Sequence, residues 1–363
     1  MPTDIKIPPA IVARIVERFR HHLDRLHQRS APASAAMFEM VLGAWVAQAI
    51  NVAADLGIAD ALVDRPLPLA DLADRVGADP DALRRLMRAL IGRGIFRQRR
   101  DGRYDLTAVA ETLRSDAPFS MRGYARLLGS PQHREHWSLL GESVRSGKAI
   151  LPQLRGKDAF DYLRDEPELA KLFNDAMTGL DGLAAVTVVA GYSFDPYRTI
   201  VDVGGGHGGL LSTILAATPN ARGVLYDLPE VVAGASELLS RCGVEDRVRV
   251  EGGSFFDSVP SGGDAYVLKN VIHDWPDEQA VAILRNVRAA AGLDATVLLV
   301  ETVLPGHDRD FAGKWVDLEM LLLANGRERD AAECRELLRR AGFRMTRVVH
   351  TASPFSVVEA TPA

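Results

Sequence analysis

The chain has 363 residues, of which 47% are hydrophobic and 25% are charged, so its length predicts two or three ordinary globular domains. Its formal net charge of −5 excludes a basic surface for nucleic acid that extends over the whole chain. The two cysteines, Cys242 and Cys334, lie far apart in the sequence, which argues against a disulfide scaffold and against a cysteine-based metal site.

The N-terminal segment MPTDIKIPPAIVARIVERF is interrupted by two prolines and soon carries charge. It therefore lacks the apolar core of a signal peptide. Residues 11–29 have a helical but polar pattern. We find no run of about 18 uncharged apolar residues anywhere in the chain, so we expect no membrane span and a cytoplasmic protein.

Residues 36–63 form a predicted helix pair that is apolar over much of its surface. A helix that is apolar on more than one face must be buried, either in a core or against a partner subunit. This pattern favours a homodimer formed through the N-terminal helices.

Residues 69–113 have the pattern of a winged helix-turn-helix. A short helix at 69–76 is followed by Asp79, which can cap the next helix, and by Pro80 at its first position. A hairpin of 95–98 and 103–106 then surrounds the turn signal Asp101-Gly102. We assign residues 1–113 to a helical, winged-helix domain.

This module raises a DNA-binding alternative, because arginines that suit a recognition helix and a wing are concentrated in it. The acidic chain and the chemistry predicted downstream favour instead a structural or interface role, and we predict no nucleic-acid partner. The eight arginines are Arg84, Arg85, Arg88, Arg93, Arg97, Arg99, Arg100 and Arg103.

Residues 114–182 are mostly helical in pattern and are broken near Gly147. Bulky apolar residues such as Tyr162, Phe173 and Met177 fit an ordinary core or a wall over a flat apolar substrate. From 183 to 363 the chain alternates strands with helices, which is typical of an α/β fold with a parallel, doubly wound, Rossmann-like sheet. Such sheets bind ligands at the carboxyl ends of their strands.

The segment VDVGGGHGG runs from an apolar strand into a helix. Glycines at Gly204 and Gly206 let the backbone approach a ligand closely. Asp227, at the end of the next strand, can accept hydrogen bonds from both ribose hydroxyls. The spacing matches the dinucleotide fingerprint but also suits S-adenosylmethionine, so the loop alone does not separate a nicotinamide-dependent oxidoreductase from a methyltransferase.

Downstream, the strand in YVLKNVIHDWPDE delivers His273 to the carboxyl end of the sheet. Glu301 ends the next strand, and Glu328 lies in a loop before a helix with a capping-box start. A neutral histidine can take a proton from a hydroxyl, and a carboxylate can orient it. Asp274 either pairs with His273 or caps the following helix, for which Asp277 is the other candidate cap.

The ordered motifs VDVGGGHGG, YDLPEVV, LKNVIHDWPDE, VETVLP, GRERD and LLRRAGF resemble those of the S-adenosylmethionine-dependent small-molecule O-methyltransferases. That family includes the plant caffeate and flavonoid enzymes, hydroxyindole O-methyltransferase, and bacterial enzymes of polyketide and phenazine tailoring. The likeness covers residues 197–363 by spacing, and the winged helix and LFNDAM extend it to nearly the whole chain.

The resemblance implies a role for each matching residue. The catalytic group has His273 as general base, bracketed by Glu301 and Glu328, with Asp274 beside it. Many relatives have Asp where this chain has Ser254, so the contact beside the adenine carries no charge here. The implied cofactor-binding residues are Gly204, Gly206, Asp227, Leu228, Ser254, Phe255, Lys269 and Trp275, and the implied substrate-binding residues are Asn174, Met177 and Met320.

The resemblance also implies a homodimer, a winged-helix module that serves dimerisation, a 114–182 segment that contributes to the substrate pocket, and no metal. The acceptor is expected to be a hydroxyl of an aromatic or polyketide-type molecule. Some relatives keep the fold and catalyse hydroxylation instead, so a methyltransferase-fold hydroxylase is an alternative alongside the oxidoreductase.

Overall fold

The computed structural model describes residues 7–363 and divides the chain into two compact units. The sheet unit comprises the described part of Met1–His22, together with Gly141–Ala159 and Leu183–Ala363, and the helical unit comprises Leu23–Leu140 and Phe160–Gly182. Residues 1–6, which begin the predicted 1–113 domain, lie outside the described residues. The division falls within the helices α1 (Ala10–Arg29), α10 (Leu140–Ser146), α12 (Ala159–Asp165) and α13 (Pro167–Gly191).

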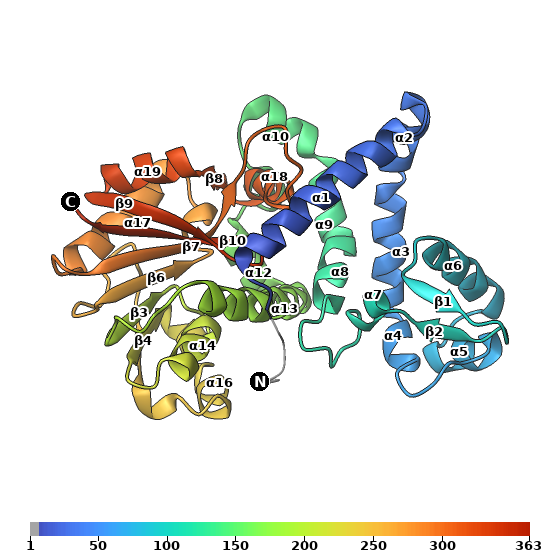
Figure 1. The fold of residues 1–363 in the computed structure, drawn as a ribbon, viewed down its shortest axis with the longest axis horizontal. Helices are drawn as coiled ribbons and strands as arrows, with labels where there is room; N and C mark the ends of the chain where they lie inside the picture. The colour runs from blue at the N-terminus through green and yellow to red at the C-terminus, as the bar shows by residue number, and fades with distance from the viewer. Residues whose placement is uncertain (1–6) are drawn as a thin grey trace. The chain divides into compact units, whose positions relative to one another are not determined.

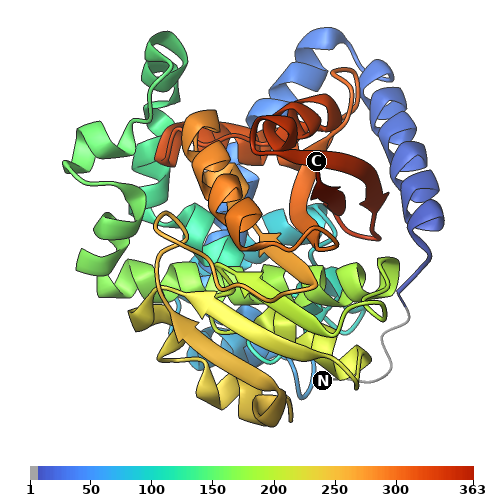
Figure 2. The same ribbon diagram turned by 90° about the vertical axis from the view of Figure 1, so that its left-hand side faces the viewer.

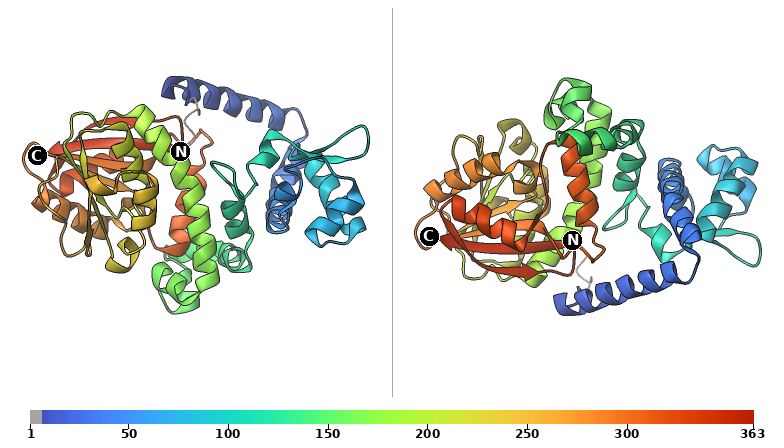
Figure 3. Two further views of the ribbon diagram at one scale, coloured as in Figure 1. Left: turned by 90° about the horizontal axis from the view of Figure 1, so that it is seen from below. Right: turned by 90° about the horizontal axis from the view of Figure 1, so that it is seen from above.

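The helical unit contains the predicted winged helix. Helices α5 (Leu69–Val76) and α6 (Pro80–Gly92) pack beside the antiparallel hairpin of β1 (Phe96–Gln98) and β2 (Tyr104–Leu106) (Figures 1 and 3). The predicted cap of α6 is confirmed, because the Asp79 carboxylate accepts the Ala82 N–H at 2.8 Å. The remaining elements wholly in this unit are α2 (Ala33–Val41), α3 (Gly43–Asp55), α4 (Ile58–Ala61), α7 (Ala108–Glu111), α8 (Arg122–Gly129) and α9 (Pro131–Ser138).

Three of the eight arginines of the winged helix are paired inside the wing, and one of them, Arg103, lies 3.6 Å from the carboxylate of Asp101. The Asp105 carboxylate, whose side chain is 11% exposed, lies 2.6 Å from the Arg97 guanidinium and 2.9 Å from that of Arg99. These cations therefore stabilise the hairpin and are partly neutralised at its surface.

Helices α2 and α3 expose a large apolar surface in the single chain. The exposed fractions of Phe38 and Trp45 are 62% and 74%. The stretch Ala33–Asp55 is long and apolar enough to cross a membrane by length and composition alone. The charged residue Glu39 lies within this stretch, so the stretch is not an uncharged apolar run of the kind that the sequence search looked for. Helices at a subunit interface pass the same test of length and composition.

The sheet unit is built on strands in the order β5-β4-β3-β6-β7-β10-β9. The first five strands of this order, β5, β4, β3, β6 and β7, are parallel, and β10 pairs antiparallel with both of its neighbours, β7 and β9. The predicted fold class is confirmed, but strand β10 was not predicted and makes the sheet mixed. The strands are β3 (Thr199–Val203), β4 (Arg222–Asp227), β5 (Val248–Gly252), β6 (Ala265–Lys269), β7 (Thr296–Leu304), β9 (Phe343–His350) and β10 (Phe355–Pro362), with β8 (Arg329–Asp330) pairing with β7.

Helices cover both faces of this twisted sheet (Figures 1 and 2). Successive strand residues point to opposite faces, so Ile200 packs with α14 and α16 while Val201 packs with α17 and α19. Both faces of the sheet are buried beneath helices, which explains the apolar sequence of the strands. The helices wholly in this unit are α11 (Leu151–Arg155), α14 (Gly209–Ala217), α15 (Pro229–Val232), α16 (Ser236–Arg241), α17 (Asp277–Ala290), α18 (Gly313–Leu323) and α19 (Ala331–Arg340), with the 3₁₀ turns η1 (Glu245–Arg247) and η2 (Ile272–Asp274).

Candidate active site

The turn after β6 presents His273 at the carboxyl edge of the sheet. Asn270 adopts a left-handed conformation with φ +52°, and the chain then forms the single 3₁₀ turn η2. Ile272, which is 2% exposed, anchors this turn in the core. The side chain of His273 remains 13% exposed, so it lies at the boundary between core and solvent.

Glu301 is 6% exposed, and the prediction that it ends its strand was wrong: pairing of Val303 and Leu304 with β8 extends β7 three residues beyond it. Its Oε1 accepts the Ile272 N–H at 2.9 Å, which ties the strand to the turn that carries His273. Its Oε2 is buried without a hydrogen-bond partner among residues 7–363. Burial raises the pKa of Glu301 to about 7, and the nearby His273 opposes that rise.

Glu328 comes from the loop between α18 and β8, and its side chain is 1% exposed. Its Oε1 lies 2.8 Å from Nδ1 of His273. The loop passes very close to the histidine, because a Cβ at Gly326 would overlap the His273 carbonyl. The Arg327 N–H donates to that same carbonyl at 2.8 Å. Glycine at 326 is therefore required for Glu328 to reach the imidazole.

Asp274 lies on the other side of the ring, with Oδ1 3.4 Å from Nε2 of His273. The alternative that Asp274 or Asp277 caps the next helix was wrong: the N-cap of α17 is Pro276, and no side chain caps it. A proline at this position fixes an extended entry to the helix without a side-chain acceptor. Burial raises the pKa of Asp274.

These groups set the protonation of His273. Burial alone would lower its pKa, but the charges of Asp274, Glu301 and Glu328 outweigh burial and raise the pKa to about 10. The imidazole therefore holds a proton at neutral pH in this arrangement, and it becomes a base when that proton leaves.

The same donors could hold a metal ion, because ligand atoms of His273, Glu301 and Glu328 lie within 4.8 Å of one another. The sequence predicted no metal. The hydrogen bond between His273 Nδ1 and Glu328 already orients the imidazole in the manner of a histidine–carboxylate pair.

The glycine loop follows β3 as predicted. Gly204 has φ +70°, and a Cβ there would lie 2.7 Å from Cγ2 of Val271, two residues before His273. Gly206 has φ +60°, with open space around its Cβ position, and its N–H donates to Oδ2 of Asp227 at 2.8 Å. Asp227 also accepts the Leu228 N–H at 2.7 Å, and four lone-pair sites leave room for ribose hydroxyls.

An aromatic group lies beside this loop. Phe255 approaches the Cβ position of Gly204 to 3.5 Å. The Trp275 ring centroid lies 6.2 Å from that of Phe255 and 4.7 Å from that of Phe256, edge-on in both cases. Ser254 lies in the same turn, where its Oγ accepts the Phe256 N–H at 3.2 Å. A glycine cradle, a carboxylate and an aromatic wall together fit an adenosine-bearing cofactor.

The other two predicted cofactor residues, Leu228 and Lys269, lie directly after strand β4 and at the end of strand β6. Leu228 precedes helix α15 and is 40% exposed. Lys269 ends β6, and its amine lies 5.9 Å from the ring centroid of Phe355. The predicted substrate residues are divided: Met320 lies on α18 in the sheet unit, whereas Asn174 and Met177 lie on the part of α13 that belongs to the helical unit.

Sequence reasoning missed several residues that support the site. Asp317 on α18 accepts the Glu328 N–H at 2.9 Å and so fixes the backbone of that acid. Asn286 on α17 donates to the Phe255 and Phe256 carbonyls at 2.9 and 2.8 Å. Arg329, whose side chain is 5% exposed, pairs with Asp277, whose side chain is 41% exposed, next to the turn that carries His273. No usable signal for these residues is present in the sequence. Only the burial of the arginine in GRERD marks it as unusual, and burial cannot be read from one sequence.

The fold and this site define a Rossmann-like enzyme with an adenosine-type cofactor site beside a histidine–carboxylate cluster. Residues 137–344 match the family described as O-methyltransferase domain, and residues 38–116 match the O-methyltransferase dimerisation domain. The chain belongs to the O-methyltransferase family.

Known relatives agree with this assignment. A phenazine O-methyltransferase of Lysobacter antibioticus is 41% identical over 92% of this chain and 97% of the relative. An 8-amino-8-demethylriboflavin N,N-dimethyltransferase of Streptomyces davaonensis is 35% identical over 86% of this chain and 91% of the relative. The crystal structure of an O-methyltransferase from neocarzinostatin biosynthesis, in complex with S-adenosylmethionine and 2-hydroxy-5-methyl naphthoic acid, has a TM-score of 0.73 at 35% identity, covering 88% of this chain and 96% of that one.

The protein is an S-adenosylmethionine-dependent methyltransferase of the secondary-metabolite type. The nicotinamide alternative, which the glycine loop alone left open, is thereby set aside.

Proposed function

We propose that this enzyme transfers a methyl group from S-adenosylmethionine to a hydroxyl of a small aromatic or polyketide-type molecule, with His273 as the general base. The observation that carries the proposal is the buried contact of 2.8 Å between His273 Nδ1 and Glu328, which leaves Nε2 on the side facing away from that acid. Phenazine and naphthoic acid chemistry among the relatives supports an aromatic acceptor.

The cofactor supplies an electrophilic methyl group on a sulfonium when it is bound. On the protein side, Nε2 of neutral His273 accepts the hydroxyl proton as the acceptor oxygen forms its new bond to carbon. Glu328 holds the ring and stabilises the imidazolium, and Asp274 adds a second charge at 3.4 Å. General-base assistance of this kind contributes about 10²–10⁴-fold. Alignment of the two reactants supplies the remainder.

The cofactor-binding residues are proposed from their placement and from the family resemblance, and the acceptor-binding residues from the resemblance alone. Gly204 and Gly206 would form the backbone cradle of the cofactor, Asp227 and Leu228 would hold its ribose, and Phe255 would lie beside its adenine. Three further residues, Ser254, Lys269 and Trp275, complete the cofactor site, and Asn174, Met177 and Met320 contribute to the acceptor pocket.

The organisation of the chain follows the same proposal. Residues 1–113 serve dimerisation, 114–182 contribute to the acceptor pocket, and 183–363 bind the cofactor and catalyse transfer. A second copy of the chain would cover the exposed Phe38 and Trp45 in a homodimer. We expect the enzyme to work in the cytoplasm.

Two measurements test the proposal in sequence. Isothermal titration should show micromolar binding of S-adenosylmethionine, and absent binding would contradict it. A mass-spectrometric screen of phenols, phenazines, polyketides and matched aromatic amines should then yield products heavier by one CH₂ from hydroxyl acceptors. Transfer to amines alone would assign N-methylation instead, and a gain of one oxygen would assign the hydroxylase alternative.

A further inference from the structure

Arg329 is a charged residue that the proposed reaction does not use, yet its side chain is only 5% exposed. It lies in β8, directly after Glu328, and points back beneath the turn that carries His273. Burial of an arginine is costly unless its donors are satisfied, so its partners indicate what it does.

The guanidinium of Arg329 spans the two ends of the His273-Asp274 segment. Nη1 donates to the Ile272 carbonyl at 3.1 Å, and Nη2 donates to the Trp275 carbonyl at 3.0 Å. One residue on each side of His273-Asp274 is therefore held by the same planar group. The ends of the turn cannot separate without breaking one of these bonds.

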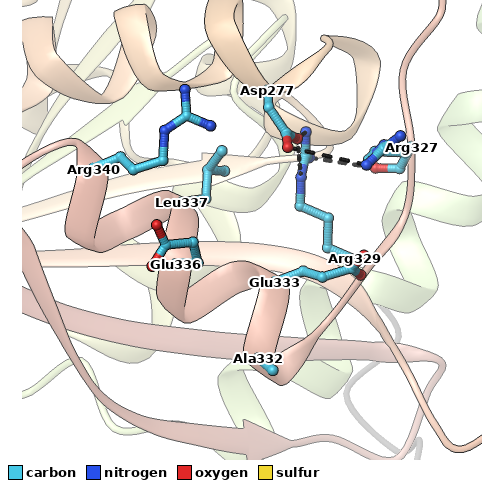
Figure 4. A pocket seen from close by; sticks show the side chains of 8 residues that line it. All are labelled: Asp277, Arg327, Arg329, Ala332, Glu333, Glu336, Leu337 and Arg340. Atoms are coloured by element: carbon cyan, nitrogen blue, oxygen red, sulfur yellow. Dashed lines mark hydrogen bonds and ion pairs between the residues drawn. The ribbon is translucent and has the colours of Figure 1, made fainter.

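Asp277 completes the arrangement from the first turn of α17. Its Oδ1 lies 2.8 Å from Nη2 and 3.2 Å from Nε of Arg329 (Figure 4). The Arg329 charge lowers the pKa of Asp277 against a desolvation that would raise it, so this carboxylate stays ionised. A hollow of about 240 Å³, lined by both residues together with Leu337 and Arg340, opens on their outer side.

We propose that Arg329 is a positioning residue for methyl transfer: together with Asp277 it clamps the backbone of Ile272–Trp275 and thereby sets the imidazole of His273 against Glu328 and the acceptor. This rests on the proposed role of His273 as base. The planar fork is essential, because Nη1, Nη2 and Nε reach the two carbonyls and the carboxylate separately, whereas the three donors of a lysine ammonium all lie on one nitrogen.

The clamp is tested with Arg329→Gln and Arg329→Lys, each made in the wild-type and His273→Ala backgrounds. We expect Arg329→Gln and Arg329→Lys to lower kcat by about tenfold or more, with the KM for the acceptor within about twofold. In the His273→Ala background the same changes should cause no further loss, because residues that act through one group are not additive. Arg340→Gln, from the same hollow but paired with Glu278, is the matched control and should stay near wild type.

Equal losses in both backgrounds would show that Arg329 acts only on folding and would overturn the clamp, as would full activity of both Arg329 variants. If Arg329→Gln does not fold, Arg329→Lys decides, because it keeps the buried charge. Failure of the proposed function is distinguished separately: it would appear as full turnover of His273→Ala itself, whatever the Arg329 variants do.

Discussion

Replacing Glu328 with Gln removes one charge from the cluster and leaves the shape of the side chain almost unchanged. The carboxylate oxygen lies 2.8 Å from Nδ1 of His273, and the two side chains are 1% and 13% exposed, so little water screens the pair. At about 4 Å between charge centres and an effective dielectric constant of about 20, the attraction is ~4 kcal/mol.

That attraction corresponds to about three pH units in the proton affinity of the imidazole. The sign follows from the role of His273: its pKa is raised to about 10, and the base is the deprotonated form, so kcat/KM rises with pH as the proton leaves. Losing the Glu328 charge lowers that pKa and moves the rising limb toward lower pH. Because water and neighbouring groups relax around the variant, we expect a displacement of at least one pH unit.

The assay is the pH dependence of kcat/KM for methyl transfer, followed by mass spectrometry, for wild type, Glu328→Gln and the exposed control Glu237→Gln. The plateau of Glu328→Gln should also fall about tenfold, because a less basic and less oriented imidazole is a weaker catalyst. A rising limb that stays in place, or moves to higher pH, would refute the electrostatic reasoning.

Three further outcomes follow from the structure. Gly204→Ala should weaken S-adenosylmethionine binding by tenfold or more and lower the melting temperature, since its Cβ would meet Val271 at 2.7 Å in a left-handed backbone. Gly206→Ala has open space around its Cβ and should lower the melting temperature less, which differential scanning fluorimetry would check. Asp227→Asn should reduce cofactor affinity measured by titration calorimetry, because the amide loses acceptor capacity while keeping its size, and unchanged affinity would remove the ribose role. Asp79→Ala should cost about 1 kcal/mol in chemical denaturation by uncapping α6, with methyl transfer unaffected.

Local rules predicted much of the fold. The Asp79 cap, the wing hairpin and the capping box at Asp330 and Glu333 are all present, since each depends on residues within a few positions of one another. Strand β10 forms a local hairpin with β9, but its insertion between β7 and β9 depends on the long-range pairing with β7, which no short pattern encodes.

The candidate site shows the same division. Two expected strand ends and one loop placed His273, Glu301 and Glu328 at one edge of the sheet, where their ligand atoms lie within 4.8 Å of one another, although Glu301 lies within β7 and not at its end. The sequence could not show that Gly326 brings its loop against the His273 carbonyl, or that Arg329 lies beneath the turn, because both facts depend on burial and on the path of a loop.

The central claim is that His273 removes the proton from the acceptor. The most direct measurement is methyl transfer from methyl-labelled S-adenosylmethionine by His273→Ala, with cofactor affinity determined on the same preparation and His307→Ala, an exposed histidine, as the matched control. The account predicts a rate at least about 10²-fold below wild type, an affinity within about twofold, and a control that behaves as wild type. Turnover of His273→Ala near the wild-type rate would contradict it.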